Sequence, residues 1–298
     1  MSNAIAISPS VDAEPTAVSE APPQERVIRA RPGWISVDWD ELWQFRELLY
    51  FLVWRDVKVR YKQTALGVAW AVLVPVFSMV IFTVIFGNFA HMKNELPGGM
   101  NYAIFSYAGL LPWLFFSTAL SLGGQSLVNQ QQLLTKIYFP RLFVPTAVVG
   151  GALVDMGISF GVMALMMAWY RVMPTWSVLA ILPLMVPLCL ASLGIAYSFS
   201  ALTVTYRDFR FVLQFLVQAW MFVSPVIYPV SFVPVRYQWV LAINPMSGLI
   251  DGFRAALLGR FQQWQPLNLS ISIASSIILF VSGLFYFRKT ERRFADIA

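Results

Sequence analysis

Six long apolar segments, separated by more polar stretches, dominate the pattern of hydrophobic and polar positions along the 298-residue chain. A helix needs roughly 20 mainly apolar residues to cross a hydrocarbon core about 30 Å thick. The segments cover Ala65–Phe89, Ile104–Leu127, Phe143–Trp169, Trp176–Val204, Phe211–Tyr228 and Leu269–Phe287. This pattern predicts an all-α membrane protein with six transmembrane helices.

Two further stretches have a helical pattern of their own. In Trp39–Lys62, the apolar residues Leu42, Phe45, Leu49 and Leu52 recur at helical spacing. This stretch also carries Trp and Arg, which favours an amphipathic helix lying in the membrane interface. The alternative is a cytoplasmic helix packed on the bundle.

The second stretch, Trp239–Leu258, is apolar enough to enter the membrane but is interrupted by Asn244-Pro245 and by two glycines. Irregular backbone at membrane depth must be buried in protein or line a cavity. We therefore predict a re-entrant helix pair between spans five and six on the outer side. The alternative is a surface loop with two amphipathic turns.

Composition supports the membrane class, because 12% of the residues are charged, against about 25% in soluble domains. A single cysteine and a single histidine exclude a disulfide framework and a metal site rich in either residue. Residues 1–33 are rich in Ala, Pro, Ser and Glu and lack the apolar core of a signal peptide. We expect them to form a disordered cytoplasmic tail, followed by one membrane domain over residues 34–298.

The basic residues predict the orientation. Of the 21 Lys and Arg residues, 16 fall on the side of the N-terminus and 5 on the opposite side of the six segments. Because cytoplasmic loops carry the excess of Lys and Arg, both termini are expected in the cytoplasm, with the chain crossing the inner (plasma) membrane several times. The basic residues lie beside apolar segments rather than in one patch, so no nucleic-acid partner is expected.

Candidate chemistry inside the spans is sparse. Asp155 is the one ionisable carboxylate within them, and its charge is costly at mid-membrane unless it faces the bundle interior. It could accept a hydrogen bond from a substrate, act in a gate, or form an interhelical hydrogen bond. The chain has no phosphate-binding Gly-x-x-x-x-Gly-Lys-[Ser/Thr] motif and no constellation of catalytic groups. We therefore expect a non-enzymatic subunit without a cofactor of its own.

Two other groups of residues suggest transport. Aromatic rings can pack against carbohydrate, and Phe77, Phe82, Trp220 and Phe222 are candidates for a conduit lining, although core packing is the commoner role of any one aromatic residue. The stretch 129–143 lies between two apolar segments and carries Lys136 and Arg141 but no acidic residue. It is expected to form a short cytoplasmic helix that a separate subunit binds.

Several motifs together resemble one family. They are Trp54–Thr64 followed by Leu66–Trp70, Lys136–Arg141, Tyr206–Asp208, Ser224-Pro225 with Ile227–Pro229, and Asn244–Met246 with Phe253-Arg254 and Gly259. In this combination the chain resembles the type-2 ABC transporter permeases that export polysaccharides such as O-antigen, capsule and teichoic acid. The resemblance covers about Trp39 to Arg293.

The resemblance implies a homodimer that moves a lipid-linked polysaccharide, with two copies of a separate ABC ATPase subunit that binds ATP and Mg. It also implies three groups of functional residues. ATPase coupling would fall to Gln131, Leu134, Lys136, Tyr138 and Arg141. An outer gate would include Asn244, Pro245, Asp251 and Arg254. The conduit would be lined by Phe77, Phe82, Asp155, Trp220 and Phe222.

Two other classes of transporter are weighed against this one. An ABC-2 permease for drugs or lipids is the nearest alternative. A secondary transporter or channel is the other, and it would be favoured by inverted repeats or by several charges within the spans. The sequence shows neither feature.

Overall fold

The computed structural model describes residues 39–62, 67–89, 92, 96, 99–132, 138–206, 208–259 and 266–291. Regular structure in these residues is entirely helical, which confirms the predicted all-α class. The predicted tail, residues 1–33, lies outside the described residues.

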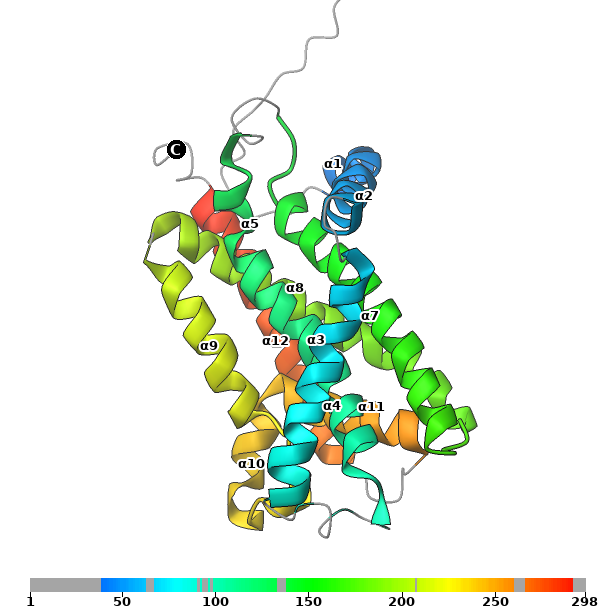
Figure 1. The fold of residues 1–298 in the computed structure, drawn as a ribbon. Helices are drawn as coiled ribbons and strands as arrows, with labels where there is room; N and C mark the ends of the chain where they lie inside the picture. The colour runs from blue at the N-terminus through cyan, green and yellow to red at the C-terminus, as the bar shows by residue number, and fades with distance from the viewer. Residues whose placement is uncertain are drawn as a thin grey trace, which may run out of the picture. The chain divides into compact units, whose positions relative to one another are not determined.

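Figure 1 shows the helices in chain order. Their bounds are α1 Trp39–Gln44, α2 Arg46–Lys62, α3 Gly67–Phe82, η1 Thr83–Phe89, α4 Tyr102–Thr118, η4 Ala119–Gly123, α5 Gly124–Asn129, α7 Phe143–Trp169, η5 Trp176–Ala180, α8 Ile181–Thr205, α9 Phe209–Val223, η6 Val230–Phe232, α10 Val235–Ile243, α11 Pro245–Leu258 and α12 Pro266–Glu291.

Five helical stretches in the described part of the chain are long and apolar enough to cross a membrane, and they match five of the six predicted spans. The remaining span was predicted over Phe211–Tyr228, but its helix α9 has 15 residues and ends at Val223. Ser224 is extended, with φ −95° and ψ 144°, because the residue before a proline avoids the helical region. The predicted end of this helix is therefore wrong. At about 22 Å, α9 is shorter than a hydrocarbon core, so a sixth span stays a prediction.

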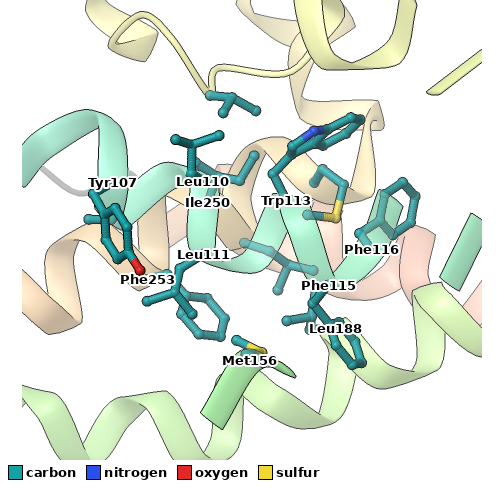
Figure 2. Close-up of a cluster of buried hydrophobic side chains, with 14 of the residues drawn as sticks. Tyr107, Leu110, Leu111, Trp113, Phe115, Phe116, Met156, Leu188, Ile250 and Phe253 are labelled. Carbon is teal, nitrogen blue, oxygen red and sulfur yellow. The ribbon is translucent and has the colours of Figure 1, made fainter. Parts of the chain in front are cut away.

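Helix α4 forms the centre of the main hydrophobic core. Its side chains are buried along nearly its whole length, and it packs against α3, α7 and α11. Figure 2 shows Trp113 and Phe116 of α4 within this cluster, with Met156 from α7, Leu188 from α8 and Phe253 from α11 close by. The core is thus built from segments far apart in the sequence.

A second hydrophobic cluster joins α1 and α2 to the bundle. The predicted stripe of Leu42, Phe45, Leu49 and Leu52 packs there, against residues that include Tyr197 and Phe287. The helical spacing is confirmed, and the stripe is covered by protein.

The opposite face of this helix pair is exposed and aromatic, and it carries Trp43, Tyr50, Phe51 and Trp54. Aromatic side chains of this kind concentrate at the membrane–water boundary. The location of α1 and α2 in the membrane interface stays a prediction that this face supports.

Helices α8 and α12 touch at their backbones. A Cβ atom on Gly283 would overlap the carbonyl of Gly194, so only glycine fits at this crossing. Close backbone approach through small residues is a common way for membrane helices to pack.

The predicted helix pair between spans five and six is present as α10 and α11, divided at Asn244-Pro245. Helix α11 is buried along its length by α4, α8 and α12, so it is not part of a surface loop. Its entry into the membrane stays a prediction.

Candidate functional site

The described coupling residues and the predicted gate residues form two groups toward opposite ends of α12, where Arg141 bonds Glu291 and Asn244 bonds Ser272. One group lies beside α1, α2 and the C-terminal end of α12, and the other lies beside α10 and α11. We call them the α2 end, defined by Glu41, Tyr138, Arg141 and Glu291, and the α11 end, defined by Asn244 and Arg254.

At the α2 end, two side chains from the segment before α7 bind distant helices. The hydroxyl of Tyr138 donates to Oε1 of Glu41 in α1 at 3.1 Å, although Tyr138 is 75% exposed. The guanidinium of Arg141 donates to the carbonyl oxygen of Glu291 at 3.2 Å. Arg288 forms an ion pair with Glu291 at 3.1 Å. This end therefore connects α1, α7 and α12.

The five predicted coupling residues are only partly placed. Gln131 is exposed just beyond α5, and Tyr138 and Arg141 lie as described above. Leu134 and Lys136 fall outside the described residues. Sequence reasoning missed Glu41 and Glu291, because nothing in the local sequence indicates which distant acidic residues would meet this segment.

Asp155 links α7 to the end of α2, where it accepts hydrogen bonds from Arg60 and Tyr61. Of the roles weighed for Asp155, the structure shows the interhelical hydrogen bond, made with a cationic partner. The pair borders a groove of about 360 Å³ between α2, α3, α4 and α7, whose other lining residues include Trp70 and Phe115. A neighbouring cavity of about 320 Å³ shares Arg60 and Leu122 with it.

The other predicted conduit residues do not surround this groove. Phe77 on α3 and Phe222 on α9 are exposed, at 59% and 54% respectively. Phe82 and Trp220 are partly buried and pack against the main core. The ring of Trp220 contacts Phe116 edge-on, with centroids 5.3 Å apart. Within the described residues, only Asp155 of the five lines the groove.

Asn244 is the centre of a hydrogen-bond network at the α11 end. Its Oδ1 accepts from the backbone N–H of Met246 and from Nε1 of Trp220, both at 3.0 Å. Its Nδ2 donates to Oγ of Ser224 at 2.9 Å. Its carbonyl accepts from Oγ of Ser272 at 3.2 Å.

One amide side chain thus begins α11, as an N-cap followed by Pro245 at the first helical position. The same residue bonds Ser224, just after α9, and Ser272, in the N-terminal part of α12. Sequence reasoning found Asn244 and Pro245 but missed Ser224 and Ser272 as partners.

Arg254 of α11 is 5% exposed and donates to the backbone of the irregular segment after α9. Its Nη1 lies 2.6 Å from the carbonyl oxygen of Pro225, and its Nη2 lies 2.5 Å from that of Val226. Its Nε donates to the carbonyl of Phe105 at 3.2 Å, and its guanidinium lies 3.8 Å from the centre of the Phe105 ring.

The carbonyl groups of Pro225 and Val226 lie outside any helix, after the end of α9, and burying them unpaired would be costly. Burial lowers the pKa of Arg254 to about 10, so the guanidinium keeps its charge at neutral pH. Burial also raises the pKa of the half-buried Asp251. Direct hydrogen bonds from Arg254 thus join α11 to α4 and to the irregular segment after α9.

Among the described residues, no group of three or more His, Cys, Asp or Glu side chains lies close enough together to hold a metal ion.

Comparisons with known proteins agree with the motifs. The profile of the ABC-2 type transporter family matches residues 47–258. The chain is 32% identical to the O-antigen export system permease protein RfbA of Myxococcus xanthus, over 84% of this chain and 96% of the relative. It is 27% identical to a protein of the same name from Klebsiella pneumoniae, over 84% and 95%. It is 26% identical to the polysialic acid transport protein KpsM of Escherichia coli, over 80% and 91%.

Proposed function

We propose that this chain, which belongs to the ABC-2 type transporter family, is the membrane subunit of an exporter that moves a lipid-linked polysaccharide across the inner membrane. The observation that carries the proposal is its likeness to permeases named for O-antigen export and polysialic acid transport along more than 90% of their length. ATP would be hydrolysed by a separate subunit, present in two copies beside a homodimer of this chain.

The α2 end supports a docking role for the ATPase. Tyr138 is exposed, yet its hydroxyl is bonded to α1, so a partner that moves it would also move α1 and α2. Arg141 connects the same segment to α12. We assign Gln131, Leu134, Lys136, Tyr138 and Arg141 to this docking surface, on the cytoplasmic side.

The bare faces of α3 and α9 support a conduit between two copies of the chain. Along α3, large apolar side chains such as Phe77 and Ile81 are exposed, and on α9 Phe215 and Phe222 are exposed. In the proposed homodimer, Phe77 and Phe222 would line the path of the glycan. Phe82, Trp220 and Asp155 would hold the helices behind it. Asn244, Pro245, Asp251 and Arg254 would form the outer gate, on a re-entrant α10–α11 pair.

The first test is affinity purification of the tagged full chain from its native membrane in mild detergent, followed by mass spectrometry. A stoichiometric ABC ATPase subunit is the expected result, and its absence from a stable preparation would overturn the proposal.

The second test removes the gene and measures polysaccharide at the cell surface, with the restored gene as control. We expect loss of the surface polysaccharide and its return on complementation. Unchanged polysaccharide together with altered drug or lipid efflux would move the chain to another cargo class.

A further inference from the structure

An apolar groove that no predicted role uses lies at the far end of α7 from the Arg141 contact. Its volume is about 670 Å³, within the range of sites that bind small ligands. The lining residues come from α7, the segment after it, η5, α8 and α11, and all but one are uncharged. Those that matter here are Phe160, Met163, Ala164, Met167, Ala168 and Arg171.

The length of the groove corresponds to one leaflet of a bilayer. From Phe160 to Arg171 the chain advances eleven positions, most of them within α7, or about 16 Å at 1.5 Å per residue. Half of a hydrocarbon core about 30 Å thick is roughly 15 Å. A groove along the last part of a membrane-crossing helix therefore runs from mid-membrane to the membrane surface.

Arg171 marks the surface end. Trp169 and Trp176, on either side of it in sequence, are 83% and 87% exposed, as expected of residues at the membrane–water boundary. Within the described residues, the guanidinium of Arg171 forms no ion pair or hydrogen bond. The groove thus has an apolar lining and, at its surface end, one guanidinium that can bind an anion.

Arg171 has a backbone conformation that arginine rarely adopts. Helix α7 ends in a Schellman motif, in which the N–H of Val172 donates to Met167 and that of Arg171 donates to Ala168. Arg171 has φ 54°, in the left-handed region where glycine is the favoured residue. An arginine in this position has a conformational cost, which a contact made by its side chain would offset.

We propose that this groove binds one acyl chain of an anionic phospholipid in the outer leaflet, with the lipid phosphate at Arg171. Flexible Met163 and Met167 suit a chain of variable shape, and no acidic residue lines the groove to repel the headgroup. This site lies apart from α3 and α9 and does not depend on the identity of the exported cargo.

The test is native mass spectrometry of the purified full chain with its co-purifying partners, after incubation with equal amounts of phosphatidylglycerol and phosphatidylcholine. We expect wild type to retain more phosphatidylglycerol. R171Q should lower phosphatidylglycerol binding about two- to fivefold, as expected for one exposed ion pair, and should leave phosphatidylcholine unchanged. A164W should fill the groove and lower the binding of both lipids about tenfold, because several methylene groups lose their contacts.

Matched controls separate the groove from general effects. R236Q removes an exposed arginine on α10, and L165W introduces the same tryptophan side chain at an exposed neighbour that does not line the groove. Equal lipid binding by R171Q and R236Q would overturn the role of the cation. Equal binding by A164W and L165W would overturn the acyl-chain site. Because Ala164 and Arg171 are exposed, both variants are expected to fold.

Discussion

The two ends of the molecule are held together in different ways. At the α11 end, Arg254 and Asn244 make buried or half-buried hydrogen bonds that converge from several helices. At the α2 end, Tyr138 and Arg141 each make one long-range bond; the Arg141 bond is half-buried, whereas the Tyr138 bond is exposed. Buried polar networks fix one arrangement, whereas exposed contacts add little stability and can be exchanged for a partner's contacts.

This difference matches the roles proposed for the two ends. An outer gate must hold an irregular segment closed until the transport cycle opens it, which favours a strong local network. A surface that receives a motor must accept new contacts without unfolding, which favours exposed side chains. The contrast predicts larger losses of stability from substitutions at Arg254 and Asn244 than at Tyr138.

Removing the Arg254 guanidinium should cause the greatest loss of stability. R254M leaves the carbonyl groups of Pro225 and Val226 buried without a donor and should lower stability by about 2–4 kcal/mol. R254K keeps the charge but not the fork of donors, so an intermediate loss is expected. Thermal unfolding in detergent measures this, with R236Q as the control. An unchanged Tm for R254M would show that the carbonyl groups find other donors.

The next largest effect is expected at Asn244. N244A removes the N-cap of α11 together with the bonds to Trp220 and Ser224, and should cost about 1–2 kcal/mol. Asn101 caps α4 by the same kind of bond, but its side chain bonds no other helix among the described residues, which makes N101A a matched control. Equal losses in the two variants would mean that the network adds nothing to the cap.

A smaller effect is expected where α2 meets α7. Asp155 and Arg60 are partly exposed, so D155N should lower stability by about 0.5–1 kcal/mol. A double-mutant cycle with R60Q isolates the energy of the pair. D56N, which breaks a pair within α2, is the control. Additive effects of D155N and R60Q would show that the pair contributes nothing to the docking of α2.

The smallest change in stability is expected at Tyr138. Y138F loses one exposed hydrogen bond and should change stability by less than about 0.5 kcal/mol. Y138A, alone or with R141A, should lower polysaccharide export several-fold at a normal protein level, because the proposed contact with the ATPase is lost. Y50F and Y50A, at an exposed aromatic residue of α2, are the controls. Normal export by the double variant would show that Tyr138 and Arg141 are not needed for docking of the ATPase.

Local patterns in the sequence predicted much of the fold. Helical spacing found the stripe of Leu42, Phe45, Leu49 and Leu52, and hydropathy found five long apolar helices. The break before Pro225 could also have been predicted, because a residue before proline avoids helical geometry. The predicted span to Tyr228 gave hydropathy more weight than this local rule.

Hydropathy could not rank the helices by burial. The stretch that holds α3 is more apolar than the one that holds α4, yet α3 is largely bare and α4 is the centre of the core. Hydropathy separates lipid from water, but both lipid and protein interiors are apolar, so it does not separate these two from each other. The partners of Asp155, more than 90 residues away in sequence, are likewise invisible to local spacing.

Helix α12 gives the molecule a mechanical linkage between its two ends. Ser272, near one end, donates a hydrogen bond to the carbonyl of Asn244, and the carbonyl of Glu291, at the other end, accepts one from Arg141. These contacts are nineteen residues apart on one unbroken helix, or about 28 Å along its axis. Between these two contacts, the close backbone crossing of Gly283 with Gly194 of α8 restricts the movement of α12 relative to α8. A displacement of Arg141 is therefore expected to shift α12 as a rigid body and, through Ser272, to displace Asn244.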